Sequence, residues 1–297
     1  MKIPGFTLSL MAKNFEKRAA KKRPEIFANL KYDHKLDVNY AGDGNDKHCF
    51  DAFFAEKDKR LGKLIIDVHG GAYILSTRKE NFIFGKVFLE QGFDFIAVDY
   101  RLNDGSLSVA DQISDCVACI NYITDHAKDL GIEGDEIYLT GDSAGGHFAL
   151  LLAEMANNDE LCDKMGLKFH AFKPKAVLVN CTVFDLVAST QAKAMTNGAR
   201  RRMFGPRVDD IELARLYSPK EHFGDLKLPV FASTCKREFL RNESLQLSKA
   251  LEGRDDFEFI DIDSDDKQVD HVHNVNFPDL PESIRVNSGM IEFMKKY

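Results

Sequence analysis

The chain has 297 residues, of which 44% are hydrophobic and 29% are charged, a composition that is typical of a globular protein and excludes a disordered one. The 47 acidic and 40 basic side chains give a formal net charge of −7, which argues against nucleic acid as a partner because phosphate binding needs a concentrated basic surface. No segment has enough consecutive apolar residues to span a bilayer.

Residues 1–30 form an opening segment that stands outside the pattern of the remaining chain. Its basic run, residues 17–23, is expected to be the solvated face of a helix. Lys13, Glu16 and Lys17 arrive before the apolar stretch is long enough for a secretory signal, so secretion by that route is not expected.

From residue 35 onward, short apolar runs alternate with helical patterns, which indicates a mainly parallel sheet covered on both faces. Two early runs, 35–40 and 48–55, are joined by turn residues and are expected to pair antiparallel. Nearly continuous apolar runs suit buried parallel strands, and these lie at 63–68, 94–100, 136–140, 176–180, 228–233 and 257–262. Helices are expected at 81–90, 109–130, 144–156, 244–251 and 281–296. The connection 182–217 is longer than usual and is well placed to roof a pocket.

Six cysteines are scattered along the chain and do not have the arrangement of a small disulfide scaffold. Cys116 and Cys119 have the spacing of a metal knuckle, but no second Cys/His pair accompanies them, and they fall in the predicted helix 109–130. We therefore expect them to pack in the core, and we expect a reducing, cytoplasmic location.

A glycine-rich turn follows the predicted strand 136–140. Residues 141–146, Gly-Asp-Ser-Ala-Gly-Gly, fit the pattern G-x-S-x-G and lead directly into the predicted helix 144–156. This context lifts the hydroxyl of Ser143 above the sheet, and the helix N-terminus favours negative charge that develops beside it. Taken alone, the turn could equally cap the helix, with Ser143 as the N-cap residue. The missing Lys-Ser/Thr ending argues against a phosphate-binding loop.

A pair of glycines, Gly70 and Gly71, follows His69 directly after the predicted strand 63–68. Bare backbone lets N–H groups reach the negatively charged oxygen of a tetrahedral intermediate, and each such donor contributes about 3 kcal/mol. A simple glycine turn is the alternative interpretation. The order in which HGG precedes GDSAGG favours an oxyanion hole and an exposed nucleophile.

A serine nucleophile needs a histidine base and a carboxylate that orients the base, in the chain order Ser, Asp/Glu, His. Two histidines, His271 and His273, lie beyond the last predicted strand, in a loop before the terminal helix. Either is placed to act as a base for Ser143 by chain order alone.

The acid has several candidates. Glu238 is the only carboxylate before Glu243 in the loop that follows the strand Leu-Pro-Val-Phe-Ala-Ser. Asp263 and Asp265 are closer to the histidines in sequence, in an acidic cluster that is more typical of a solvated turn, and they form the second choice. Asp270 directly precedes His271 in sequence, and a carboxylate in that position is poorly placed to hydrogen-bond the imidazole ring of His271.

The segments HGGAY (69–73), DYRL (99–102) and GDSAGG (141–146), in this order and spacing, resemble those of the hormone-sensitive-lipase-like carboxylesterases of the α/β-hydrolase superfamily. The resemblance extends from residue 63 to the C-terminus and is most detailed over residues 68–146. It implies a single α/β-hydrolase domain over 1–297, with cap elements from about 1–30 and 182–217.

The resemblance also implies roles for individual residues. Ser143 is the implied nucleophile, and His271, in a segment like the family's G-H-x-F, is the implied base. His273 then stands where an aromatic residue is usual and is expected to pack. The family's acid lies in a G-x-x-D-P-L-like segment, which implies Glu238 here. The implied oxyanion hole consists of the N–H groups of Gly70, Gly71 and Ala144.

Two departures from the family pattern affect what we expect of the site. Glu replaces Asp at position 238, which adds one methylene of reach. The family's Y-R-L-A-P-E continues here as Tyr-Arg-Leu-Asn-Asp-Gly at 100–105, so the pocket edge beside this loop is expected to differ. The cap that the resemblance implies holds four large apolar residues that could line a pocket but are expected to form the cap's own core: Phe184, Met195, Met203 and Phe204.

These features together predict a serine carboxylesterase that hydrolyses small or medium acyl esters through an acyl-enzyme on Ser143. We expect a small-molecule ester as partner, no nucleic acid, no membrane span, and neither a metal nor an organic cofactor. A homo-oligomer remains open. The alternatives are an amidase or peptidase, or a deacetylase of acylated sugars, with the same triad. A non-catalytic ligand-binding protein on the hydrolase scaffold is the alternative from a different class.

Overall fold

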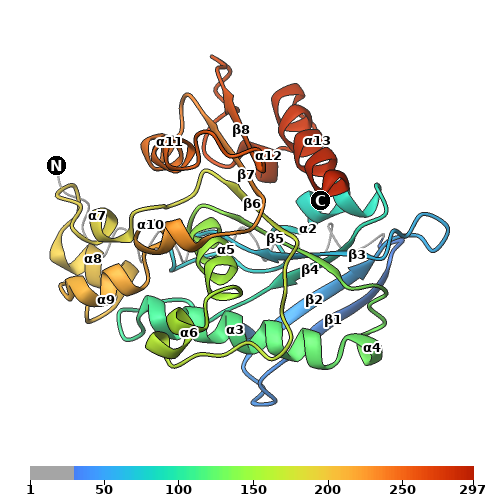
Figure 1. Ribbon diagram of the computed structural model, residues 1–297, viewed down its shortest axis with the longest axis horizontal. Coiled ribbons are helices and arrows are strands. Elements are labelled where there is room, and N and C mark those ends of the chain that lie inside the picture. Colours follow the sequence, from blue (N-terminus) through green and yellow to red (C-terminus); the bar gives the residue numbers. More distant parts are fainter. Residues whose placement is uncertain (1–29) are drawn as a thin grey trace.

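The computed structural model describes residues 30–297, so nearly all of the opening segment, with its basic run at 17–23, lies outside the described residues. Within 30–297 the expected strands and helices form one sheet with helices on both faces (Figure 1). No helix in this part of the chain is long and apolar enough to cross a membrane.

Eight strands form a single sheet in the order β1-β2-β4-β3-β5-β6-β7-β8. The strands are β1 (Asp33–Asn39), β2 (Cys49–Phe54), β3 (Lys63–Val68), β4 (Asp94–Val98), β5 (Glu136–Asp142), β6 (Ala176–Asn180), β7 (Val230–Cys235) and β8 (Phe257–Ile262). β1 pairs antiparallel with β2, and β2 with β4, whereas all other neighbours are parallel. The antiparallel start and the mainly parallel remainder both agree with the expectation.

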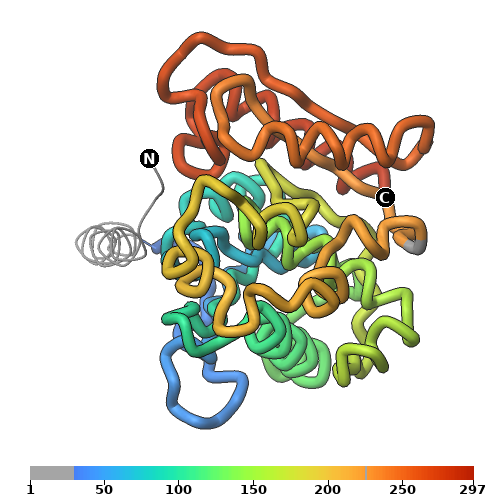
Figure 2. Tube along the Cα trace, turned by 90° about the vertical axis from the view of Figure 1, so that its left-hand side faces the viewer, coloured from blue at the N-terminus to red at the C-terminus, as the bar shows by residue number. Residues whose placement is uncertain are grey.

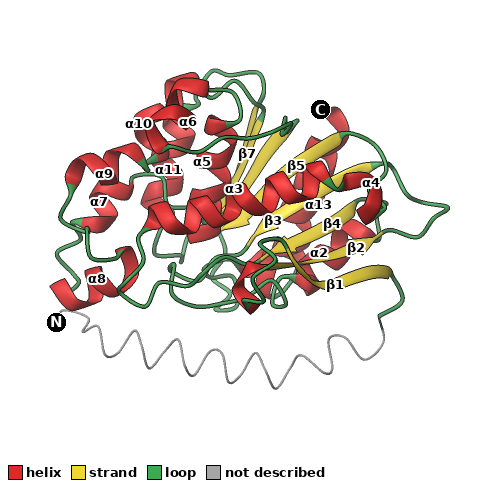
Figure 3. Cartoon of the chain, turned by 90° about the horizontal axis from the view of Figure 1, so that it is seen from below, coloured by secondary structure: helices red, strands yellow, loops and turns green. Residues whose placement is uncertain are grey.

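Helices cover both faces of this sheet (Figures 1 and 3). They are α2 (Phe82–Leu89), α3 (Val109–Asp125), α4 (Ala127–Leu130), α5 (Ala144–Met155), α6 (Asp159–Met165), α7 (Leu186–Thr190), α8 (Asn197–Phe204), α9 (Ile211–Leu216), α10 (Pro219–His222), α11 (Arg241–Ala250), α12 (His273–Asn276) and α13 (Pro281–Lys296). The apolar core forms two clusters: α3, α5, α6 and α11 contribute to one, and α2, α12 and α13 to the other. Every residue of β2, β4, β6 and β7 is buried, which explains why their sequences are mainly apolar.

Several elements end at other residues than predicted. The predicted helix 109–130 is interrupted at His126, whose φ of −111° is not helical, and forms α3 and α4. β5 continues through Asp142, two residues beyond the predicted end, where it pairs with Asn180 of β6. The sequence did not predict α6 and α12, which have 7 and 4 residues, because such short helices show no clear period.

The connection 182–217 contains α7, α8 and α9 and lies at one side of the molecule, where it is seen in yellow facing the viewer in Figure 2. Phe184 and Phe204 are buried and Met195 and Met203 are partly buried, all within or against the same apolar cluster as α5. These four side chains therefore pack as core residues.

The six cysteines are all free and buried. Cys116 and Cys119 lie in α3 within one of the two apolar clusters, so the prediction that they pack in the core is confirmed.

Candidate active site

Ser143 lies at the sharp turn between β5 and α5. Its φ of 54° and ψ of −118° are unusual for a residue with a side chain, as expected for a serine held on a strained turn. A Cβ at Gly141 would overlap the carbonyl oxygen of Gly145, and a Cβ at Gly145 would overlap that of Val68. The two glycines of the motif are therefore required by the close approach of backbone segments.

The Ser143 hydroxyl is directed at a histidine. Its Oγ lies 3.0 Å from Nε2 of His271, and it makes no cap hydrogen bond to α5. The other ring nitrogen of His271, Nδ1, lies 3.1 Å from Oε2 of Glu238. In the tautomer that satisfies both contacts, Nδ1–H donates to the carboxylate and Nε2 accepts from the serine. The geometry thus disfavours the interpretation of Ser143 as a simple N-cap.

Glu238 is buried and held by two further hydrogen bonds. Its Oε2 accepts from the backbone N–H of Leu240 at 2.6 Å, and its Oε1 accepts from the hydroxyl of Thr234 at 2.8 Å. These bonds leave the carboxylate little freedom to rotate away from His271. The longer Glu side chain is accommodated here without loss of the contact to the ring.

The aspartates considered for the same position lie elsewhere. Asp263 and Asp265 pair with Lys236 at 2.9 and 3.0 Å, and their side chains are 83% and 91% exposed. Asp270 accepts the backbone N–H of His271 and does not bond its ring. The structure therefore brings Glu238, and none of these three, to His271.

His273 is separated from the serine. It is buried, and its Nδ1 lies 2.8 Å from the hydroxyl of Ser283 in α13. Burial lowers the pKa of this imidazole, so the neutral form is favoured. Its packing role agrees with the expectation.

The three predicted oxyanion donors differ in their hydrogen bonds. The N–H of Gly70 donates to Oδ1 of Asp142 at 3.0 Å and so is already engaged. Among the described residues, by contrast, the N–H groups of Gly71 and Ala144 have no hydrogen-bond acceptor. Position 71 also needs glycine, because its φ is +115° and a Cβ would overlap the carbonyl oxygen of Leu75. The candidate donors are therefore Gly71 and Ala144, without Gly70.

Asp142, which sequence reasoning treated as a variable position of the motif, connects the two glycine turns. Besides Gly70, its Oδ1 accepts from the side-chain amide of Asn81 at 3.1 Å, and the same amide donates to Asp67 at 2.8 Å. Burial, followed by the nearby charge of Asp142, raises the pKa of Asp67 well above its ordinary value. Only the sheet order, which places β3 beside β5, could have predicted this contact.

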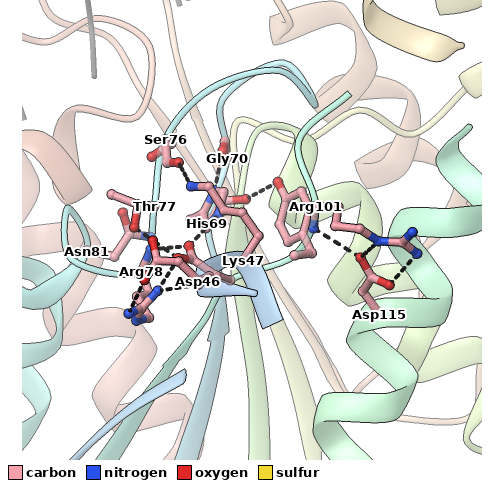
Figure 4. Close-up of polar contacts among 12 residues, drawn as sticks. Asp46, Lys47, His69, Gly70, Ser76, Thr77, Arg78, Asn81, Arg101 and Asp115 are labelled. Carbon is pink, nitrogen blue, oxygen red and sulfur yellow. Dashed lines mark hydrogen bonds and ion pairs between the residues drawn. The ribbon is translucent and has the colours of Figure 1, made fainter. Parts of the chain in front are cut away.

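A buried ion cluster anchors the other side of the His69 loop (Figure 4). Asp99, after β4, accepts from the Arg78 guanidinium and from the Arg78 backbone N–H, and lies 3.2 Å from Nε2 of His69. Burial alone would raise the pKa of Asp99, but the bond to His69 and the charges of Lys47 and Arg78 hold it well below its ordinary range. The ionised Asp99 thus ties this loop to the sheet.

His147 is a second residue that the sequence did not single out. It is fully buried in the first turn of α5, where its Nε2–H donates to the carbonyl of Tyr217 at 2.7 Å and its Nδ1 accepts from the hydroxyl of Tyr73 at 3.1 Å. Burial lowers its pKa to about 4, so it is neutral near pH 7. It joins the glycine loop to the end of the connection 182–217.

An exposed aromatic residue lies next to the candidate base. The ring of Phe239 lies 4.2 Å from the His271 ring, centroid to centroid, although Phe239 is 76% exposed.

A hollow lies beside the glycine loop. The loop 100–105, where the sequence departs from the family, borders this hollow of about 310 Å³, which also contacts Ile74 of the glycine loop. Six of the nine residues that line this hollow are polar or charged, among them the basic residues Lys47 and Arg202.

The arrangement has the parts required for nucleophilic acyl transfer. A hydroxyl contacts a base, and the base contacts a buried carboxylate. Two backbone N–H groups without acceptors belong to Gly71, in the loop after β3, and to Ala144, the first residue of α5. No other group in the described residues needs to move for a proton to pass from Ser143 to His271.

Comparisons with known proteins agree with this architecture. The chain matches the sequence model of the BD-FAE family over residues 50–238. A probable isoprenylcysteine alpha-carbonyl methylesterase of Arabidopsis thaliana is 33% identical over 82 residues, which are 28% of this chain and 17% of that protein. An acetylxylan esterase of Xylanibacter ruminicola is 28% identical over 123 residues, 41% of this chain and 24% of that protein. The matches span less than half the length of these curated relatives.

Solved structures resemble the whole described chain. An inhibited esterase B from Lactobacillus rhamnosis has a TM-score of 0.82 and 21% identity, and the match covers 97% of this chain and 96% of that one. At this level of identity the likeness shows the fold, which is the expected α/β-hydrolase fold.

Proposed function

The chain belongs to the BD-FAE family of α/β-hydrolase esterases, and we propose that it is a serine carboxylesterase acting through an acyl-enzyme on Ser143. The observation that carries the proposal is the continuous line of hydrogen bonds from the Ser143 hydroxyl through His271 to the buried carboxylate of Glu238. A purely structural glycine turn would not require this line. A ligand-binding protein that had lost catalysis would not need to keep its base.

In the proposed reaction, Oγ of Ser143 attacks the carbonyl carbon of an ester while its proton passes to Nε2 of His271. The tetrahedral intermediate collapses, and the same proton goes to the departing alkoxide, which leaves as the alcohol. A water molecule then attacks the acyl-enzyme, gives one proton to Nε2, and releases the acid as the proton returns to Oγ. Glu238 keeps Nδ1–H oriented and stabilises the imidazolium in both steps.

The negative oxygen of each intermediate would accept from the N–H groups of Gly71 and Ala144. Ala144 is the first residue of α5, so the partial positive charge of the helix N-terminus adds to its donor. Gly70 holds the position of this loop through Asp142 and does not itself donate to the intermediate. We propose that residues 182–217 form a cap over this site, within one domain.

The substrate class is proposed from the surroundings of His271. Because the leaving alcohol takes its proton from Nε2, it must lie beside this ring, where the exposed phenyl of Phe239 is its apolar neighbour. We therefore propose esters of small or medium acyl groups with an apolar or aromatic alcohol. A cytoplasmic location is a further proposal, supported by six buried cysteines that are all free.

Deacylation of sugar esters is a second candidate, favoured by the polar and charged residues that line the hollow beside the glycine loop. Hydroxyl-rich groups would be held by accessible polar side chains such as Lys47 and Asp104, which border it. The acetylxylan esterase named among the relatives is in keeping with this alternative.

The proposal is tested with a fluorophosphonate probe and a panel of nitrophenyl esters of increasing acyl length, together with acetylated xylo-oligosaccharides and a nitroanilide. We expect the probe to label Ser143 and the short nitrophenyl esters to be hydrolysed fastest. Faster deacetylation of the oligosaccharides would assign the second candidate, and faster cleavage of the nitroanilide would assign an amidase. Absence of both labelling and hydrolysis in the folded protein would refute an enzymatic function.

A further inference from the structure

A cysteine lies beside the Glu238–His271 pair and has no part in the proposed reaction. Cys181 directly follows β6, its φ is 48°, and its Sγ accepts the backbone N–H of Val272 at 3.5 Å. The thiol sulfur, a carboxylate oxygen of Glu238 and a ring nitrogen of His271 all lie within 4.8 Å of one another. Three different ligand types thus converge at the Glu238–His271 pair.

This set of atoms has the chemistry of a zinc site. Zn²⁺ binds thiolate, imidazole and carboxylate at about 2.0 to 2.3 Å, which places tetrahedral ligands about 3.5 Å apart. The ligand atoms are therefore at most about 1.3 Å too far apart, a movement that side-chain rotation can supply. One thiolate and one carboxylate also balance the two positive charges. Cys181 and Glu238 are buried, while the His271 side chain is 20% exposed and gives access from solvent.

We propose that Cys181, Glu238 and Nδ1 of His271 form an inhibitory site for Zn²⁺ or Cd²⁺, with water as the remaining ligand. Binding releases the thiol proton to solvent, and the imidazole proton moves from Nδ1 to Nε2, because the metal occupies the Nδ1 lone pair. Nε2 then carries a proton and cannot accept the one from Ser143. The metal also takes the carboxylate that orients the ring. This inhibition rests on the proposed esterase function, but the metal site itself does not.

The test uses Cd²⁺ because a cadmium–thiolate bond absorbs in the ultraviolet, and this readout does not depend on activity. We expect one Cd²⁺ per chain to produce the absorption in the wild-type protein and in Ser143→Ala, which keeps all three ligands. Cys181→Ser should lose it. The matched control is Cys162→Ser, which changes another buried thiol, in α6, that bonds the carbonyl of Met155.

The same variants are then compared for inhibition of ester hydrolysis by Zn²⁺, each relative to its own activity without metal. Removing a residue that only hydrogen-bonds to a metal ligand already weakens metal binding about 10- to 100-fold. Removing Cys181, which would bind the metal directly, should therefore raise the inhibitory Zn²⁺ concentration at least tenfold. Cys162→Ser should match the wild type.

Three results would overturn the proposal: equal cadmium absorption in Cys181→Ser and wild type, no absorption in the wild type at millimolar Cd²⁺, or equal zinc inhibition with and without Cys181. If the metal-free wild type hydrolyses no ester, the proposed function fails. The cadmium absorption then still decides whether the site exists.

Discussion

The two halves of the candidate site are built in different ways. The nucleophile half consists of two glycine turns, after β3 and β5, which neighbouring parallel strands bring together through Gly70 and Asp142. The acid–base half consists of loops after β7 and β8, and His271 is 128 residues from Ser143 in sequence. In the first half the backbone is fixed by close packing. In the second half a few hydrogen bonds hold the carboxylate of Glu238 and the imidazole of His271. Substitutions should therefore have different consequences in the two halves.

The largest effect is expected at the single atom that both halves share. Ser143→Ala removes the nucleophile and should lower kcat by about 10⁶, because members of a triad act as a unit. The fold should persist, since alanine is smaller and the glycines around it are unchanged. Loss of labelling by a fluorophosphonate, with an unchanged melting temperature, is the measurement. Near-normal turnover by a folded variant would remove Ser143 from its role.

The acid–base half is tested by Glu238→Gln, which keeps the shape of the side chain but removes its charge. The amide supports the imidazolium poorly and favours the wrong tautomer, so kcat should fall by about 10⁴. Asp263→Asn is the matched control and should change kcat little, because Asp263 is 83% exposed and pairs with Lys236. The reverse ranking in steady-state rates would move the role of the acid to the aspartate.

The nucleophile half is tested by Gly71→Ala, which places a Cβ against the carbonyl of Leu75 and displaces a proposed oxyanion donor. We expect kcat to fall by about 10²- to 10³-fold. Gly42→Ala is the control, since Gly42 also has a positive φ, +69°, but has open space around it. Denaturant unfolding of both variants separates backbone strain from lost catalysis. Full activity in Gly71→Ala would exclude its N–H from the oxyanion hole.

The same contrast explains what the sequence could predict. The turn at Ser143 could be predicted from local motifs. A strand followed by G-x-S-x-G and a helix restricts the backbone to one sharp turn, which exposes the serine. Strands were predicted correctly where both faces are buried, as in β3 and β6. Chain order favoured Glu238 over the second candidates Asp263 and Asp265, but the sequence alone could not decide between them, because the answer depends on which loop ends lie side by side across the sheet.

Long-range polar contacts were beyond sequence reasoning. The bond between Gly70 and Asp142 joins residues 72 positions apart, and it engages the N–H of one of the three predicted oxyanion donors. His147 looked like an ordinary helix residue, because its partners Tyr73 and Tyr217 come from segments far away in the chain. Such contacts depend on the tertiary arrangement and have no local signature.

His147, which links the glycine loop to the connection 182–217, should make the free energy of unfolding depend on pH. Its folded pKa of about 4 lies below the ordinary value of 6.5, so between these values the unfolded chain binds a proton that the folded chain does not. Stability should therefore fall as the pH falls from 6.5 toward 4, by roughly 2 kcal/mol at pH 5.

The measurement is urea unfolding at pH 7 and pH 5 for the wild type and His147→Gln. The variant should lose stability at pH 7, because the bonds to Tyr73 and Tyr217 are altered, but its loss between pH 7 and pH 5 should be smaller by about this amount. Equal pH dependence in the two proteins would show that His147 does not carry the effect.

The smallest effect is expected at the rim of the acid–base half. If Phe239 contacts the leaving alcohol, Phe239→Ala should lower kcat/KM for phenyl acetate by about two- to tenfold, the usual size of an aromatic contact, and leave methyl acetate nearly unchanged. Phe277→Ala, which removes another partly exposed phenyl side chain (46% exposed), should affect neither ester. The two esters share an acyl group, so a difference between them reports on the alcohol alone. An equal loss for both would mean that Phe239 acts on the His271 ring by shielding its bond to Glu238 from water, and the proposed preference for apolar alcohols would be wrong.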